Sequence, residues 1–313
     1  MTSRTVCGVL GLLGVALTSE GRPAPMPVGG QAVIEGVMMK GYTRWGMAVR
    51  DGAGKLVREH WPLKPVKLGG AEKWPVLRGF LVMVEMLVAG FHGLSRSTEI
   101  SLGEEEDLTT KDLILTGVLA FAAVAGLFVV LPMILGKLSA RWLGLPVWGA
   151  NVLEGLFRGG VFIAYLGLLG AWKDMARVLA YHGAEHKTIN AYEGGLPMDV
   201  STIGRCSRIH PRCGTSFLMV VVVVSIVVFS LVGQGGFLWR TGMRILLIPA
   251  VVGLSFEIIR WSTRSAVGAC VMKPALSLQY LTTREPDASQ IEAGRAALEE
   301  ALGRTFAPDE RNC

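Results

Sequence analysis

The sequence predicts an all-α integral membrane bundle of four to five spans, with a small cytoplasmic cap that includes a β-hairpin. The first observation is composition: 51% of the residues are hydrophobic and 18% are charged, whereas an average soluble domain is about 25% charged. The second is residues 113–135, a charge-free apolar run long enough to cross a bilayer. The third is that many basic residues flank such runs, which accounts for the net charge of +6. The lipid bilayer, and not a nucleic acid, is therefore the expected partner.

Four apolar runs are expected to span the membrane. They cover residues 113–135, 145–172, 217–232 and 245–259. A fifth apolar run, residues 77–94, carries Arg78, Glu85 and His92, so we expect an interfacial or re-entrant helix there, or a poor span as the alternative.

Basic residues are distributed unequally among the segments that connect the spans. Residues 173–216 carry six lysines and arginines, against two in residues 136–144 and one in residues 233–242. Cytoplasmic loops carry the excess of Lys and Arg. The protein is therefore expected in the cell membrane, with its N-terminal domain, its 173–216 loop and its C-terminal tail in the cytoplasm.

The expected organisation follows from these spans. The parts are an N-terminal extension (1–27), a Gly-rich N-domain with a hairpin (28–76), an interfacial helix and linker (77–111), spans one and two (112–172), a cytoplasmic polar loop (173–216), spans three and four (217–259), and a cytoplasmic tail (260–313). The extension has the apolar stretch of a signal peptide but no clear cleavage site. A mis-assigned start codon is the alternative explanation.

Two features predict the structure of the cap. Residues 45–50 and 55–61 are separated by the turn sequence Asp51-Gly-Ala-Gly54, which predicts a hairpin. In the tail, Asp287 followed three residues later by Gln290 predicts a capping box at the start of a helix. The segment of residues 29–36 is expected to be a glycine-rich loop.

The residues of greatest chemical interest lie in the 173–216 loop. His182 and His186 are four residues apart, so on a helix both imidazoles share one face and can reach one metal ion. Glu185 lies beside them, as the base does in H-x-x-E-H metalloenzymes. The pattern predicts a divalent metal, zinc in the first place, with Glu185 as the catalytic base. Motifs this short also occur without a metal.

The remaining metal ligand is not fixed by the sequence. His210 and Cys213 lie in the same loop and favour a metal site, since His and Cys cluster where metals bind. Glu257 lies at a membrane boundary, and Glu35 lies in the glycine-rich segment. All four remain candidates.

Charged residues also occur within the expected spans. Glu154 and Arg158 are four residues apart and are expected to pair inside the bundle. Charges of this kind also occur in transporters, but four spans without inverted repeats do not favour transport. Three further arginines before the span at residue 217 (Arg205, Arg208 and Arg212) are expected to be positive-inside anchors, with binding of a phosphate or lipid headgroup as the alternative.

With these residues in view, the chain resembles the YqhQ-like family of bacterial membrane proteins. The matching stretches are 29–39, 77–79, 181–190, 207–215, 255–257, 281–287 and 289–292. Members of the family are described as predicted metal-dependent enzymes of unknown function. The resemblance implies a shared polar set, from which Cys206 is absent. The set is His182, Glu185, His186, His210 and Cys213.

Two functions remain in competition at this point. The first is a metal-dependent hydrolase at the cytoplasmic boundary of the membrane, acting on a membrane peptide, a lipid headgroup or a lipid-linked precursor. The second is a non-enzymatic scaffold or assembly factor for membrane proteins, in which the His and Cys residues hold the cap together. A structural zinc site is filled by four protein ligands, whereas a catalytic site keeps one position open.

Overall fold

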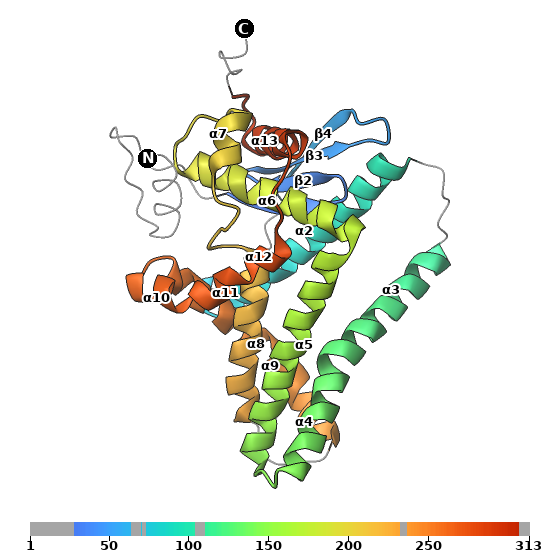
Figure 1. Ribbon diagram of the computed structural model, residues 1–313, viewed down its shortest axis with the longest axis vertical. Coiled ribbons are helices and arrows are strands. Elements are labelled where there is room, and N and C mark those ends of the chain that lie inside the picture. The colour runs from blue at the N-terminus through green and yellow to red at the C-terminus, as the bar shows by residue number, and fades with distance from the viewer. Residues whose placement is uncertain (1–27, 64–69, 71–72, 104–109, 232–236, 307–313) are drawn as a thin grey trace.

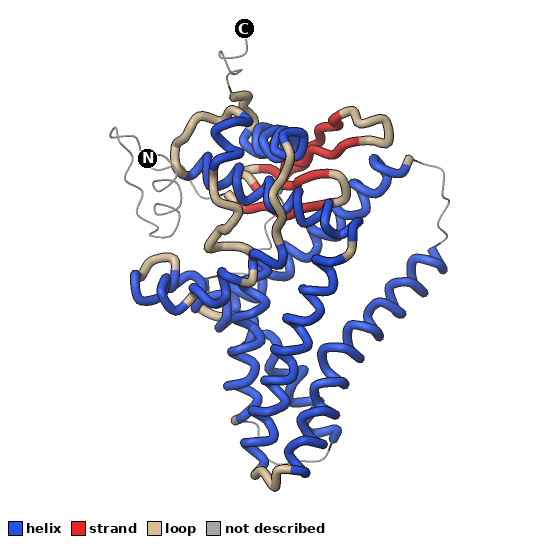
Figure 2. Tube along the Cα trace, viewed as in Figure 1, coloured by secondary structure: helices blue, strands red, loops and turns tan. Residues whose placement is uncertain are grey.

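The computed structural model describes residues 28–63, 70, 73–103, 110–231 and 237–306. The expected extension, residues 1–27, lies outside the described residues. Within them the protein has two parts, a cap and a bundle of long helices (Figure 1). The cap contains a sheet covered by helices, and the long helices extend from one side of it (Figure 2).

The sheet has four antiparallel strands in the order β1-β2-β3-β4. They are β1 (Gly29–Val33), β2 (Gly36–Lys40), β3 (Arg44–Arg50) and β4 (Leu56–Pro62). The predicted hairpin is the β3–β4 pair, in which Val49 lies opposite Val57. The expected glycine-rich loop is instead the β1–β2 hairpin, with Glu35 in its turn. That expectation was wrong because the strand does not alternate between apolar and polar residues.

Helices cover both faces of the sheet, so β2 does not alternate between apolar and polar residues. Val37 and Met39 of β2 face α6 (Lys173–Glu193) and α13 (Ala288–Leu302). Met38 of β2 faces the other way, towards α2 (Leu77–Leu102). A strand buried on both faces reads as a continuous apolar run.

Helix α13 lies directly on the backbone of β3. A Cβ atom at Gly46 would be 2.1 Å from the backbone nitrogen of Ala301 and 2.5 Å from the carbonyl oxygen of Ala297. Only glycine permits this approach. The helix begins with the predicted capping box, in which Asp287 and Gln290 each bind the other's backbone N–H.

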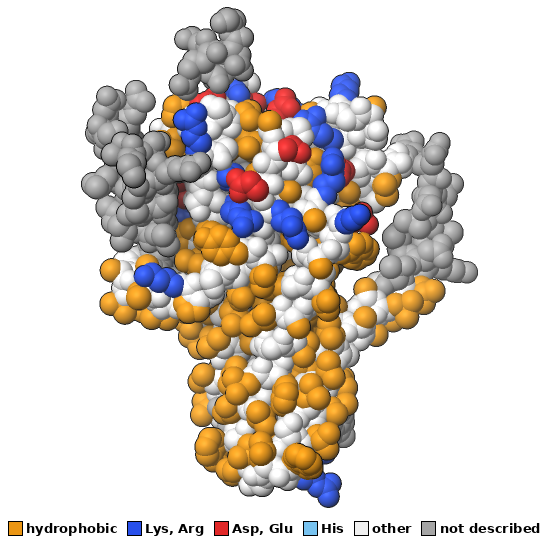
Figure 3. Space-filling view, in the orientation of Figure 1, with side chains coloured by type: hydrophobic (Ala, Val, Ile, Leu, Met, Phe, Trp, Pro, Cys, Tyr) orange, Lys and Arg blue, Asp and Glu red, His pale blue; other side chains and the backbone are white. Residues whose placement is uncertain are grey.

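In the described part of the chain, four helices are long and apolar enough to cross a membrane. They are Leu77–Leu102, Gly117–Trp142, Trp148–Ala171 and Gly242–Ser262, and a shorter apolar helix covers Gly214–Phe229. The second runs without a break through α3 (Thr110–Ala125), the π-helical segment η2 (Gly126–Val130) and α4 (Leu131–Trp142), and the others belong to α2, α5 (Val147–Ala171), α9 (Phe237–Ser262) and α8 (Gly214–Ser230). Apolar side chains cover the visible face of the long helices, while acidic and most basic side chains lie on the cap (Figure 3). The chain is an α-helical membrane protein, as its sequence predicts.

Helix α2 connects the bundle to the cap. Near its start, Gly79 lies against Phe256 of α9. In its second half, Gly93 lies against Met38 of the sheet, and the Ser97 hydroxyl accepts a hydrogen bond from the backbone nitrogen of Ile34 at 3.2 Å. The second half of this apolar helix is thus part of the cap. Its interfacial position remains a prediction.

Short helices occupy the junction between the cap and the bundle. They are α10 (Ala266–Val271), α11 (Lys273–Ser277) and α12 (Gln279–Thr282), and a further short helix, α7 (Val200–Arg205), lies in the cap. The chain therefore returns from the last long helix along the junction before it enters the cap again as α13.

Replacing Gly46 with Ala tests the close approach of α13. We expect the free energy of unfolding to fall by about 1–3 kcal/mol, because the new methyl group overlaps the backbone of α13. The measurement is the Tm of the detergent-purified protein. Gly52→Ala is the matched control, since its Cβ would meet Ser101 at an ordinary 3.5 Å. Equal Tm values for the Gly46→Ala variant and the wild type would contradict this packing.

Replacing Asp287 with Ala tests the capping box. Loss of such a cap lowers the stability of a protein by about 0.5–2 kcal/mol. Asp287→Asn keeps a capping oxygen, so we expect it to lower the stability less. Burial raises the pKa of Asp287, but hydrogen bonds from Ser289 and Gln290 outweigh it and lower the pKa. The stabilisation by Asp287 is therefore complete at neutral pH and decreases as the pH falls through the lowered pKa. Melting curves of both variants at neutral and acidic pH check this, and an equal effect of Ala and Asn would refute it.

Candidate metal centre at the junction of cap and bundle

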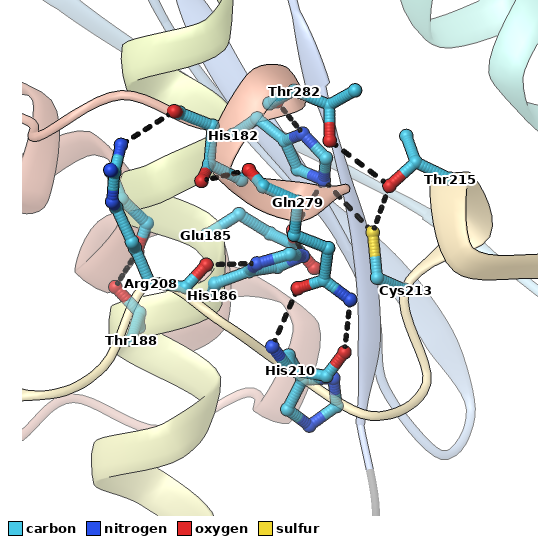
Figure 4. A network of polar contacts seen from close by, with 12 residues as sticks. His182, Glu185, His186, Thr188, Arg208, His210, Cys213, Thr215, Gln279 and Thr282 are labelled. Carbon is cyan, nitrogen blue, oxygen red and sulfur yellow. Dashed lines mark hydrogen bonds and ion pairs between the residues drawn. The ribbon is translucent and has the colours of Figure 1, made fainter. Parts of the chain in front are cut away.

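Helix α6 carries the histidine motif and lies along β1 and β2. The expected 173–216 loop is therefore helical over much of its length. One turn of helix separates His182 from His186, as the spacing predicts, and their ring centroids are 4.4 Å apart. Both side chains point to the same side of α6 (Figure 4).

Cys213 lies against these two histidines. It is the residue before α8, so the start of this helix places its thiol beside the cap. Its Sγ atom is 3.3 Å from Nε2 of His182. One donor atom from each of His182, His186 and Cys213 lies within 4.8 Å of the others. This group could hold a metal ion.

Backbone carbonyls fix the orientation of both imidazoles. Nδ1 of His182 is 2.7 Å from the carbonyl oxygen of Thr282, and Nδ1 of His186 is 2.6 Å from that of Arg208. Because a carbonyl oxygen only accepts, each Nδ1 carries the proton and donates it. Each Nε2 is then free to bind a metal, which is the arrangement that second-sphere partners impose on histidine ligands.

The Glu185 carboxylate lies beside the same donors and is buried. Its Oε2 atom is 3.4 Å from Nε2 of His186 and 3.8 Å from Nε2 of His182. Gly30 of β1 makes room for it, since a Cβ atom there would be 2.8 Å from Cγ of Glu185. A side chain at residue 30 would displace the carboxylate from the cluster.

The charges in the cluster favour a thiolate. Burial raises the pKa of the Cys213 thiol, but His186 and His182 outweigh burial and hold the pKa well below its usual value. Burial lowers the pKa of His182, but Cys213 and Glu185 outweigh it and raise the pKa to about 9. The thiolate is the form of cysteine that binds metals, and a bound cation would replace the proton on His182.

Further residues hold the site in place, and sequence reasoning missed them. The Gln279 side chain of α12 binds both backbone groups of His210, at 2.8 Å and 2.7 Å, and the Ser216 hydroxyl at 2.7 Å. The Thr215 hydroxyl is 3.1 Å from both Sγ of Cys213 and the Thr282 hydroxyl. The family resemblance contained a signal for Thr215, in the stretch 207–215, and for Thr282, in the stretch 281–287, but none for Gln279.

His210 lies next to the group of His182, His186 and Cys213. Its ring centroid is 5.8 Å from that of His186, and its Nε2 is 3.5 Å from the Glu193 carboxylate. Burial lowers the pKa of His210. In this orientation His210 supports the loop that carries Cys213.

The two other candidate ligands form ion pairs elsewhere. Glu257 of α9 binds Arg78 of α2 through two contacts of 2.6 Å and 2.5 Å. Glu35 binds Arg177 at 2.5 Å and 2.6 Å, which attaches the β1–β2 turn to α6. Among the described residues, the group that could hold a metal contains neither of them.

Comparison with known proteins agrees with the resemblance noted in the sequence. The family model described as "Protein of unknown function (DUF1385)" matches residues 74–304. The chain is 34% identical over 314 residues to a protein of Bacillus subtilis (strain 168) described as "Uncharacterized protein YqhQ", covering 92% of this chain and 96% of that protein. No solved structure matches the chain at a significant level. The chain belongs to the DUF1385 family of YqhQ-like proteins.

Proposed function

We propose that the protein is a metal-dependent hydrolase that acts at the boundary of the membrane. The observation that carries the proposal is the convergence of His182, His186 and Cys213 with the Glu185 carboxylate beside them. Three protein ligands and an adjacent carboxylate are the components of a catalytic zinc site.

The donor set fits a zinc-type ion. Imidazole nitrogen and thiolate sulfur are the ligands that zinc prefers. The two Nδ1–H groups are already bound to backbone carbonyls, so both Nε2 atoms are available without rearrangement. The lowered pKa of Cys213 supplies the anionic sulfur.

Each residue then has a role in hydrolysis. His182, His186 and Cys213 would hold the ion, which acts as a Lewis acid that polarises a carbonyl or phosphoryl oxygen and makes water a nucleophile at neutral pH. Glu185 accepts a proton from the attacking water at Oε2 and donates it to the leaving group. Strand β1 packs against this carboxylate at Gly30, and burial keeps bulk water away from it.

The location of the cluster indicates the class of substrate. Cys213 directly precedes the apolar helix α8, and the imidazole of His182 is the part of the cluster that retains some exposure, at 14%. A substrate bond presented at the level where the bundle meets the cap can reach it. We infer a membrane peptide, a lipid headgroup or a lipid-linked precursor, with the cap in the cytoplasm of the cell as the excess of basic residues indicates.

A structural role is the second candidate, and one observation favours it. Glu185 and His186 are deeply buried, and Oε2 of Glu185 lies close enough to both Nε2 atoms for the carboxylate to serve as a fourth ligand. A closed site would attach the cap to the bundle of a non-enzymatic scaffold or assembly factor. The experiments below separate the two roles.

Elemental analysis of the detergent-purified protein tests the metal site. We expect about one equivalent of zinc or another transition metal, which is lost in the His186→Ala variant because one of three ligands is missing. His92→Ala is the matched control, since His92 is exposed on α2. A wild-type protein that is folded and metal-free after purification without chelator would overturn the proposal.

Glu185→Gln separates catalysis from structure. The amide keeps the size of the side chain but cannot accept the proton, so we expect metal to be retained and turnover to fall by about 10²–10⁴-fold. Mass spectrometry of lipids and peptides from proteoliposomes of bacterial membrane extract, wild type beside the variant, measures hydrolysed products. Unchanged products in the variant would refute the role of Glu185.

Cobalt-substituted protein shows whether one coordination position is open. Addition of acetohydroxamate is expected to shift the visible absorption spectrum of the wild type, because the probe enters the open position. An unchanged spectrum would show a closed site and support the scaffold instead.

A further inference from the structure

A second group of charged side chains lies inside the bundle, apart from the candidate metal centre. NH2 of Arg158 is 2.9 Å from Oε1 of Glu154, which is the predicted pair within α5. Arg244 of α9 also binds this carboxylate, at 2.9 Å from each of its two oxygens. The sequence did not indicate the second arginine, because it comes from another helix.

Glu154 and Arg158 of α5 and Arg244 of α9 form a triad that also contacts η2 and α8. Nε of Arg158 donates to the carbonyl oxygen of Phe128 at 3.1 Å, within η2. The Phe229 ring of α8 lies 5.9 Å from one guanidinium and 5.8 Å from the other. A π-helical segment is rare and is often found at functional sites. These contacts within the bundle therefore fix the positions of both guanidinium groups.

Close helix packing places the carboxylate. A Cβ atom at Gly136 of α4 would be 2.7 Å from the Cα atom of Glu154. A Cβ atom at Gly155 would be 2.3 Å from the Ile226 side chain of α8. Small residues at such contacts let membrane helices approach closely.

The triad carries one positive charge in excess. Two guanidinium groups face one carboxylate, and within the described part of the chain no other acidic side chain forms an ion pair with Arg158 or Arg244. Their side chains are only 13% and 14% exposed. An uncompensated charge among apolar helices is costly, so an anion that binds there is stabilised.

The position of the triad indicates where the anion comes from. Glu154 and Arg244 each follow the first residue of their helix by seven positions, or about 10 Å, at the end of the bundle away from the cap. Apolar side chains of the neighbouring segments are exposed, such as Val129 of η2 and Leu246 of α9. An anionic group carried on a lipid can reach this depth from the side, and the long arginine side chains can extend towards it.

We propose that Arg158 and Arg244 bind a phosphate-class anion, either the headgroup phosphate of an anionic lipid or free phosphate. A guanidinium presents a planar fork of N–H donors that matches phosphate oxygens. Glu154 holds the two guanidinium groups side by side and leaves one charge for the ligand. The site differs from the metal centre in position, in charge and in the ligand that it binds.

Arg244→Gln tests the site in the full-length protein, because it removes the excess charge and leaves the Glu154–Arg158 pair. Native mass spectrometry counts the phosphatidylglycerol and phosphatidylcholine retained, and Tm is measured with each lipid and with inorganic phosphate. The wild type is expected to prefer phosphatidylglycerol and to be stabilised by it. Arg244→Gln is expected to weaken this binding about tenfold or more, the effect of one charge-assisted hydrogen bond.

The controls separate the sources of the anion. Arg141→Gln removes an exposed charge at the end of α4 and is expected to change nothing. Stabilisation by inorganic phosphate that equals the lipid effect and disappears in Arg244→Gln would identify free phosphate as the ligand. Equal lipid retention by Arg244→Gln and the wild type would overturn the proposal.

Arg244→Lys keeps the charge if the Gln variant does not fold, and it is expected to retain a weakened preference for the anionic lipid. A wild type that shows neither a preference for phosphatidylglycerol nor stabilisation by phosphate would also overturn the proposal.

Discussion

Helix α6 occupies the centre of the cap, and the close contacts on its sides are the constraint on which the site depends. Gly30 of β1 lies against Glu185, and Gly294 of α13 lies against Thr188. On the helix itself, a Cβ atom at Gly183 would be 2.0 Å from the carbonyl oxygen of Arg284. Three glycines therefore allow the backbone to approach α6 from a strand, a helix and a connecting segment. A helix held in this way presents His182 and its neighbours in one fixed orientation, as a preorganised site requires.

The same packing explains why residues from distant parts of the sequence meet at the junction. The segment after α6 returns to place the Arg208 carbonyl on His186, and the residue before α8 supplies Cys213. The segment after α9 supplies Gln279 and Thr282 through one short helix. Each contribution satisfies a polar group that would otherwise be buried without a partner, which is the condition for polar groups in a protein interior.

Sequence reasoning succeeded where the information is local. The spacing of His182 and His186, the capping box at Asp287, and the β3–β4 hairpin each depend on a few consecutive residues. It failed where partners come from different elements: it could not tell that Cys213, and not Glu257, lies beside the two histidines. The β1–β2 hairpin was also missed, because burial on both faces removes the alternation of apolar and polar residues by which a strand is found.

Two groups of buried polar side chains in the described part of the chain differ in the sign of their charge. At the junction, the Cys213 sulfur and the Glu185 carboxylate lie beside histidine nitrogens that point inward, and this group could hold a cation. In the bundle, Arg158 and Arg244 share one carboxylate, and there we propose an anion as the ligand. Low polarity makes an unmatched charge costly at both places. We therefore propose ligands of opposite charge at the two places, a cation near the cap and an anion within the bundle. Helix α5 carries Arg158 and also packs against α6 and α8, so one helix connects the triad with the elements that position His182, His186 and Cys213.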